Sequence, residues 1–167
     1  MPVEIQASLT SATMSEMTRP QIGFTGTRHG LTPLQREAVA AILERATRAG
    51  AFVAHHGDCV GADAEFHDLC RMLPQSYIVV HPGPLEDLPN QAGRVGDERR
   101  LHLPHMRRNK NIVIAATVMI AAPFELSPQE HGGTWRTIEM ARKAKRPLAI
   151  VSSDGATAKE RWSHDVG

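Results

Sequence analysis

The sequence predicts a doubly wound α/β fold, in which a mostly parallel, five-stranded sheet carries helices on both faces. Five short apolar runs alternate with longer stretches whose apolar residues recur at helical spacing. The runs are continuously apolar, as is typical of strands that are buried on both faces of a parallel sheet. Ligands of such sheets bind beyond the carboxyl ends of the strands. The loops that follow the strands are therefore the place to look for a site. The predicted strands are residues 21–25, 51–55, 76–80, 118–122 and 148–151.

Four predicted helices connect these strands. The first begins at Thr32-Pro33, which suits an N-cap followed by the first helical position, and ends before Gly50, a typical C-terminal cap. Between the third and fourth strands, residues 85–104 are polar and broken by Pro and Gly, which favours a ligand-facing loop over a structured element. The other three helices are expected at residues 62–73, 105–116 and 135–145.

The composition predicts one domain of a globular protein. Of the 167 residues, 41% are hydrophobic and 22% charged, and the formal net charge is only +1, so no global field attracts nucleic acid or membrane. We expect a domain over residues 21–152, a flexible N-terminal tail (1–20) and a polar C-terminal tail (153–167). With no secretion signal and no apolar run of bilayer length, a cytoplasmic protein with reduced Cys59 and Cys70 is expected.

Turns that contain glycine follow three of the predicted strands and are the main evidence for a ligand site. Glycine lets backbone N–H groups approach a ligand closely, and the start of a helix favours phosphate or carboxylate. Because the strand ends share one edge of the sheet, we expect the turns to lie together. They are Gly26-Thr27-Arg28, Gly57-Asp58-Cys59-Val60-Gly61-Ala62-Asp63 and Gly132-Gly133-Thr134.

Charged side chains beside these turns favour a phosphorylated ligand. Arg28 and Arg108 can each offer a forked guanidinium to phosphate, and Asn109 has the same alternatives as Arg108, a ligand contact or a solvated helix face. Asp58 and Asp63 could accept hydrogen bonds from ribose hydroxyls or simply cap the second helix. Neither the dinucleotide fingerprint nor the Walker lysine pattern is present, which disfavours an NAD dehydrogenase or a P-loop ATPase.

Three segments resemble the SLOG superfamily, named for the DNA-processing protein A (Smf/DprA) and Lonely guy (LOG) proteins, and in particular its small YspA-like branch. They are residues 24–28, 57–63 and 105–139. In the third, Arg108 lies fifteen residues before Pro123, as the arginine of LOG phosphoribohydrolases lies before the proline of their Pro-Gly-Gly motif. The resemblance implies a Rossmann-like fold that binds nucleotides or nucleotide derivatives, often as a homo-oligomer.

The chain departs from the LOG motif at the residue that would carry catalysis. The motif, Pro-Gly-Gly-x-Gly-Thr-x-x-Glu, ends in a glutamate that acts in cleavage of an N-glycosidic bond. Here the seven residues 124–130 separate Pro123 from His131-Gly132-Gly133. Aligning the double glycine puts Glu139 at the catalytic position, whereas aligning Gly133-Thr134 puts Thr137 there and removes the carboxylate. The YspA-like branch fits the second alignment better.

Three functions are therefore open. Binding or sensing of a nucleotide-derived molecule comes first. The second is a phosphoribohydrolase that releases the base of a nucleoside monophosphate, with Glu139 and Arg108 at its centre. The third is DprA-like DNA processing, for which the basic run over residues 99–110 could bind phosphates, although the chain has only two Trp, one Tyr and four Phe for base stacking. Nucleic acid is thus an unexpected partner, and a small molecule the expected one.

The histidines raise the question of a metal. His29, His55, His56, His81 and His131 fall near the predicted strand ends, where Asp58 and Cys59 could join them. None has the spacing of a zinc motif, so we expect hydrogen bonds to a ligand or to loop carbonyls and no cofactor. Trp135 is expected to pack at a helix start or an oligomer contact rather than stack on a base.

Overall fold

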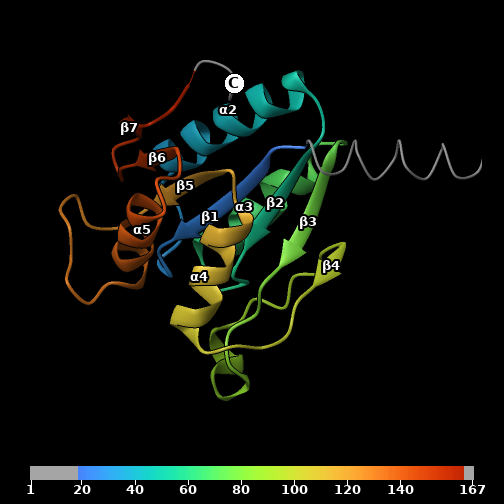
Figure 1. The fold of residues 1–167 in the computed structure, drawn as a ribbon, viewed down its shortest axis with the longest axis vertical. Helices are drawn as coiled ribbons and strands as arrows, with labels where there is room; N and C mark the ends of the chain where they lie inside the picture. Colours follow the sequence, from blue (N-terminus) through green and yellow to red (C-terminus); the bar gives the residue numbers. More distant parts are fainter. Residues whose placement is uncertain (1–18, 164–167) are drawn as a thin grey trace, which may run out of the picture.

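A seven-stranded sheet forms the centre of the computed structural model, which describes residues 19–163 (Figure 1). Its strand order is β4-β3-β2-β1-β5-β6-β7, and every neighbouring pair is parallel except β6 and β7. The predicted doubly wound α/β class is confirmed. The strands are β1 (Gln21–Gly26), β2 (Phe52–His56), β3 (Ser76–Val80), β4 (Glu98–Arg99), β5 (Val118–Ala122), β6 (Leu148–Val151) and β7 (Thr157–Glu160).

The predicted count of five strands is too low, because two edge strands carry no apolar run. β4 lies inside the stretch predicted as a loop. It is two polar residues long and pairs with Val79 and Val80 of β3. That stretch also contains a 3₁₀ helix, η1 (Leu85–Asn90), so it is partly structured. β7 lies in the predicted C-terminal tail and extends the sheet to residue 160, while the predicted N-terminal tail lies almost wholly outside the described residues.

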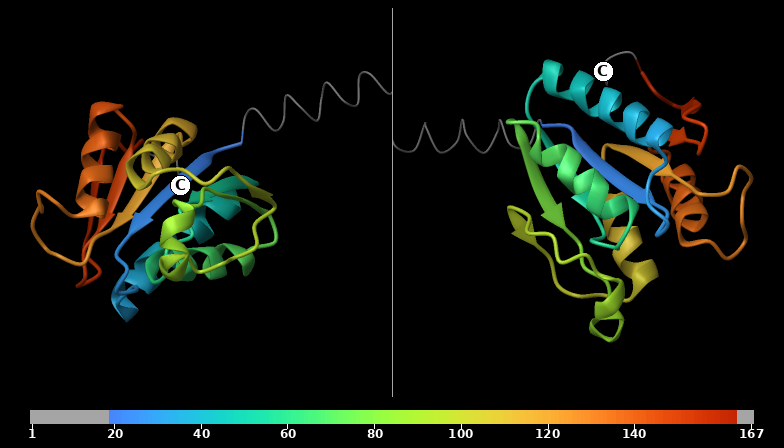
Figure 2. Two further views of the ribbon diagram at one scale, coloured as in Figure 1. Left: turned by 90° about the horizontal axis from the view of Figure 1, so that it is seen from below. Right: turned by 180° about the vertical axis from the view of Figure 1, so that it is seen from behind.

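Helices cover both faces of the sheet (Figure 2). The first core cluster joins α2 (Pro33–Ala49) and α3 (Ala62–Arg71) to one face, and the second joins α4 (His105–Ala115) and α5 (Gly133–Lys143) to the other. No helix among residues 19–163 is long and apolar enough to cross a membrane. Both cysteines are free thiols, Cys70 within the first core.

The start of α2 follows its sequence signals and ties the helix to the strand ends. Thr32 and Gln35 form a reciprocal capping box, with Pro33 as the first helical residue. The buried Gln35 amide donates to the carbonyls of Pro123 and Val151, 2.9 and 3.0 Å away. The helix is thereby fixed against the ends of β5 and β6.

The topology places a crevice beside β1. The chain moves outward from β1 to β2 and β3, and later returns to place β5 on the other side of β1. In doubly wound sheets, ligands bind at the carboxyl ends of the strands where the order reverses in this way. All three predicted glycine turns follow β1, β2 or β5, so they are brought to this place.

Candidate functional site

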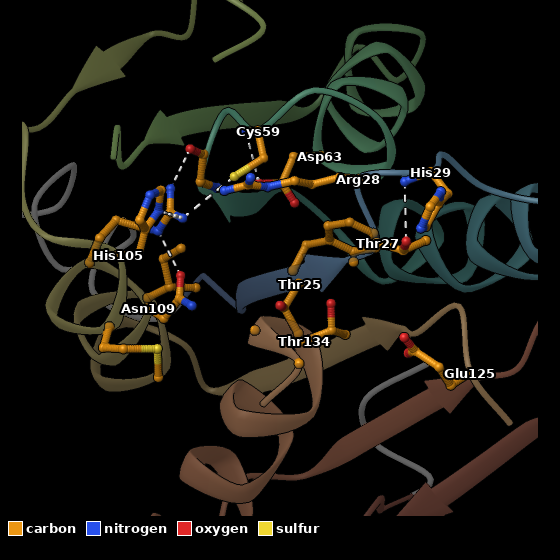
Figure 3. A pocket seen from close by; sticks show the side chains of 18 residues that line it. Thr25, Thr27, Arg28, His29, Cys59, Asp63, His105, Asn109, Glu125 and Thr134 are labelled. Atoms are coloured by element: carbon orange, nitrogen blue, oxygen red, sulfur yellow. Dashed lines mark hydrogen bonds between the residues drawn. The ribbon is translucent and has the colours of Figure 1, made fainter. Parts of the chain in front are cut away.

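A cavity of about 260 Å³ lies at the carboxyl ends of the central strands (Figure 3). Its walls come from the loops after β1 and β2, the first turns of α4 and the N-terminus of α5. The structure brings most of the predicted ligand-binding residues together there. Those on the cavity wall are Gly26, Thr27, Arg28, Gly57, Asp63, Arg108, Asn109, Gly132, Gly133 and Thr134.

Arg108 is the most buried cation of the cavity and its hydrogen bonds are used within the protein. Only 4% of its surface is exposed. Nη1 donates to the carbonyls of Gly57 and His81, at 2.5 and 3.2 Å, and Nε donates to Asn109 Oδ1 at 2.6 Å. Nη2 is 3.3 Å from His105 Nδ1 and 3.5 Å from Cys59 Sγ. A guanidinium has five N–H groups, and in Arg108 all three nitrogens already have partners within the protein. Arg108 therefore offers a ligand mainly its positive charge.

Asp63 holds the turn after β2 in shape. Its buried carboxylate accepts from the amides of Gly57 and Cys59, each at 3.1 Å. Burial raises the pKa of Asp63, while the Arg108 charge and these two amides act in the opposite direction. A Cβ on Gly57 would overlap the Arg108 guanidinium and press on Asp63, so a larger residue there would displace Arg108. Asp63 therefore orders the cavity wall, and its hydrogen bonds are spent on backbone.

Asp58 and Gly61, predicted as ligand contacts, do not lie on the cavity wall. The fully buried Asp58 carboxylate accepts from the amides of Gly93 and Arg94, at 3.2 and 2.9 Å, and pairs with Arg99 at 3.3 Å. Asp58 therefore orders the segment before β4, whereas the sequence suggested a contact with ribose hydroxyls or a cap of the second helix. Gly61 has φ +90°, and a Cβ there would collide with the Arg28 backbone, so it serves the close approach of two loops.

Four buried histidines form two hydrogen-bonded pairs, one of which binds the turn after β2. His56 Nδ1 accepts from the Asp58 amide, so its Nε2 donates to His67 Nδ1 at 2.9 Å. His55 Nε2 lies 2.7 Å from Gln21 Oε1, and its Nδ1 lies 2.9 Å from His81 Nε2. The partners are other histidines, the Gln21 side chain and the Asp58 amide, not the loop carbonyls that the sequence suggested. In residues 19–163 no three His, Cys, Asp or Glu side chains are arranged to hold a metal ion.

Burial keeps these imidazoles neutral. It lowers the pKa of His55 to about 4, with the Arg100 charge as a second cause. It lowers the pKa of His81 to about 3, helped by the neighbouring His55, and that of His56 well below its ordinary value. Desolvation disfavours the charged form of any group that is removed from water. The two histidine pairs are therefore neutral hydrogen-bonding groups, and the pair of His56 and His67 is joined to the turn after β2 through the Asp58 amide.

The N-terminus of α5 offers a different surface. Its N-cap is Gly132, and no side chain caps the helix. Gly133 and Thr134 line the cavity, and no atom lies within 4 Å of a Cβ built on Gly133. The first amides of a helix have no partner within it and carry a partial positive charge, which suits an anion. α4 also begins at the cavity without a side-chain cap, after Pro104.

Asp87, for which no role was predicted, links two residues of the cavity wall. Its carboxylate lies 3.2 Å from Arg28 Nη2 and 2.8 Å from His105 Nε2. A hydrogen bond from Asn90, followed by the charges of Arg28 and His105, lowers the pKa of Asp87. Asp87 belongs to η1, so the segment after β3 contacts two residues of the cavity wall; its ligand-facing role stays a prediction.

Further residues line the cavity without having been predicted as ligand contacts. Cys59 is half-buried, and burial raises the pKa of its thiol to about 11, which makes it a poor nucleophile. Only the histidine content drew attention to His29, and Glu125 lies in the segment that departs from the LOG motif. The additional lining residues are Phe24, Thr25, His29, Cys59, His105, Met106, Ile112 and Glu125.

Glu139 lies outside the cavity. Its side chain is exposed on α5 and pairs with Arg142 at 2.6 Å. Thr137 takes the position of the catalytic glutamate when Gly133-Thr134 are aligned with the LOG motif. It is buried and donates to the Gly133 carbonyl at 2.9 Å. The carboxylates that line the cavity are instead Asp63 and Glu125. Trp135 packs in the second core, in line with the predicted place at a helix start.

Comparison with known proteins supports the fold. No model of a protein family and no curated protein matches the sequence. A molybdenum cofactor binding protein from the phototrophic bacterium Rippkaea orientalis shares the fold with a TM-score of 0.60 and 21% identity, over 81% of this chain and 78% of that one. DNA processing protein A from Helicobacter pylori, described for its single-stranded DNA binding mode, gives 0.55 and 17%, over 80% and 65%. The Rossmann-like fold implied by the SLOG resemblance is thus confirmed.

Proposed function

We propose that the cavity binds a nucleotide or a nucleotide-derived phosphorylated molecule, in a binding or sensing role. The observation that carries the proposal is the meeting of two arginines and two uncapped helix starts at one cavity, at the switch point of the sheet. Each of these features stabilises an anion.

The phosphate would bind at the start of α5. There the amides of Gly133 and Thr134 and the Thr134 hydroxyl can donate to phosphate oxygens, and nothing in the protein crowds Gly133. Arg28 can turn from Asp87 toward the ligand because its side chain is 49% exposed. Arg108 supplies a fixed positive charge from the opposite wall.

The size of the cavity favours a mononucleotide over a dinucleotide. Its volume of about 260 Å³ is close to the lower end of the range for small-molecule sites, roughly 300–1,000 Å³. A dinucleotide would have to extend beyond the walls described above. Solution measurements with nucleoside monophosphates are therefore the first to make.

Calorimetric titration with nucleoside monophosphates tests the proposal. Arg28→Ala should weaken binding about tenfold or more, which is the usual size of a charge-assisted hydrogen bond. Arg36→Ala is the matched control, because Arg36 is similarly exposed (43%) and pairs with Glu65 at 3.6 Å away from the cavity wall. Failure of every common nucleotide and of inorganic phosphate to bind would overturn the proposal.

The hydrolase alternative is less well supported by the geometry. Glu139, the carboxylate that the LOG motif would use to cleave the N-glycosidic bond, pairs with Arg142 and does not line the cavity. We therefore expect no release of free base when the protein is incubated with nucleoside monophosphates. Base release that Glu139→Gln abolishes would restore the hydrolase.

Nucleic acid is also a less favoured partner. In the basic run, Arg99 pairs with Asp58 and Arg100 pairs with Glu98 at 3.0 Å, so part of its charge is already compensated. Binding of single-stranded DNA at physiological salt would argue for the DNA-processing alternative, because unspecific phosphate contacts weaken steeply as salt rises.

Membership of the SLOG superfamily, in the YspA-like branch, is part of the same proposal. The fold shared with DNA processing protein A supports the superfamily, and the segments quoted above support the branch. We also propose a homo-oligomer, which the resemblance implies, and a cytoplasmic location, which rests on the sequence. Light scattering on the purified protein, which measures the mass in solution, would test the oligomer directly.

A further inference from the structure

The cavity has two chemically different ends. Figure 3 shows His105 and Asn109 at one end and His29 and Glu125 at the other, with Thr25 and Thr134 between them. The first end holds Arg108, whose guanidinium contacts both His105 and Asn109. The second end has a carboxylate in place of a cation. A ligand with an anion at one end and a neutral, hydrogen-bonding group at the other would match this arrangement.

An aromatic pair stands at the second end. The rings of His29, from the loop after β1, and Phe124, directly after Pro123, lie 4.4 Å apart between centroids and are inclined by 36°. Phe124 is 51% exposed, so a large part of its ring is open to solvent. An apolar ring of this size is usually buried when it serves the fold alone. Of the two rings, His29 lines the cavity, and Phe124 contacts His29 and precedes Glu125, which also lines it.

Glu125 adds polarity to this platform. It follows Phe124 in the seven-residue segment that separates Pro123 from the double glycine, and it lines the cavity. A carboxylate accepts hydrogen bonds and repels phosphate, so it favours the N–H edge of a base or a ribose hydroxyl at this end. The anion is correspondingly directed away from Glu125, toward the start of α5 between the two ends.

We propose that His29 and Phe124 form the stacking platform for a nucleobase, so that the ligand is a nucleoside monophosphate that spans the cavity. This inference rests on the proposed function and specifies it further: Glu125 accepts hydrogen bonds from the nucleoside half, and the phosphate lies at the start of α5. Stacking on an aromatic side chain tolerates any base, because every base has a π-face. Selection among bases then depends on donors that face Glu125.

Calorimetric comparison of AMP and GMP with ribose 5-phosphate isolates the contribution of the base. The unmodified protein should bind the nucleotides about tenfold or more tightly than ribose 5-phosphate, as expected for one stacked base. Phe124→Ala should abolish this preference and leave the affinity for ribose 5-phosphate unchanged. Leu126→Ala is the control, because Leu126 is 71% exposed in the same segment and has no aromatic ring to stack on a base. It should leave both affinities unchanged.

The outcomes distinguish the two proposals. If the unmodified protein binds ribose 5-phosphate as tightly as the nucleotides, or if Phe124→Ala weakens all three ligands equally, the stacking platform is wrong and phosphate binding stands. If neither the nucleotides nor ribose 5-phosphate binds, both proposals fail. Glu125→Gln, which keeps an acceptor and removes the charge, should alter the AMP-to-GMP ratio more than it alters the affinity for ribose 5-phosphate.

Discussion

Two glycine turns at the cavity look alike in sequence and are used in opposite ways. In the turn after β2, Asp58 and Asp63 accept from backbone amides, and the glycines allow close contacts inside the protein. In the turn before α5, no side chain caps the helix and Gly133 faces open space. Asp63 occupies two amides of its own turn, so a ligand would have to compete for them. The turn before α5 has no such acceptor and leaves its first amides available.

The largest expected effect concerns the histidine network under the β2 turn. In the folded protein His55, His56 and His81 have lowered pKa values, whereas in the unfolded chain they titrate near their ordinary value. The folded state therefore binds fewer protons, and stability that is present above about pH 6.5 is lost as pH falls toward about 4. Each histidine contributes about 1.4 kcal/mol per pH unit within that window.

Denaturant unfolding at about pH 7 and about pH 5 measures this loss. His55→Gln removes one of the titrating groups and should reduce the pH dependence. His131→Gln, at an exposed position, should leave it unchanged. A free energy of unfolding that stays constant between these two pH values would contradict the neutral network.

The second-largest expected effect is the loss of folding free energy when Asp58 is substituted. Asp58→Ala would leave the Gly93 and Arg94 amides and the Arg99 guanidinium without their acceptor, which should cost about 3 kcal/mol of folding free energy. Asp58→Asn should cost less, because asparagine keeps an acceptor and tolerates the positive φ of 56°. Equilibrium unfolding in urea is the measurement. If Asp58→Ala were as stable as the unmodified protein, the carboxylate would not order this segment.

A matched pair of glycine substitutions compares the two turns directly. Gly61→Ala should destabilise the protein by about 1–3 kcal/mol, because it combines a positive φ with a collision against the Arg28 backbone. Gly133→Ala should change stability by less than about 1 kcal/mol, since the position is open and helical. Thermal unfolding of both variants would reveal the difference. A reversed order would refute the contrast between the two turns.

The smallest effect is expected for Glu139→Gln. Glu139 is exposed, and its partner Arg142 also pairs with Glu160 at 2.9 Å, so the change should alter stability by less than about 1 kcal/mol. Nucleotide affinity should be unchanged, because Glu139 does not line the cavity. A loss of affinity in titration calorimetry would place the ligand nearer to this face of α5 than we propose.

The sequence predicts the parts of the fold that local patterns determine. β3, β5 and β6 begin and end where the apolar runs do, and the α2 cap was readable from Thr32 and Pro33. β4 and β7 were not predictable, because two polar residues and an exposed Thr-Ala-Lys-Glu segment become strands only when a neighbouring strand pairs with them.

In the candidate site, too, only the features that local sequence patterns determine could be predicted. Glycine turns after strands correctly indicated which segments meet, since topology alone brings them to one edge. The direction of each side chain depends on partners that are distant in sequence. Asp58 turns toward residues 93–99, and Asp87 links Arg28 to His105, contacts that no local pattern in the sequence indicates.

Backbone amide chemical shifts during titration of isotope-labelled protein with AMP test the central claim most directly. We predict that the Gly133 and Thr134 amides shift as they donate to the phosphate, while the Gly93 and Arg94 amides, already bonded to Asp58, stay in place. Saturable shifts at Gly133 and Thr134 would support a phosphate site at the start of α5. Shifts confined to the Asp58 segment, or none at all, would contradict it.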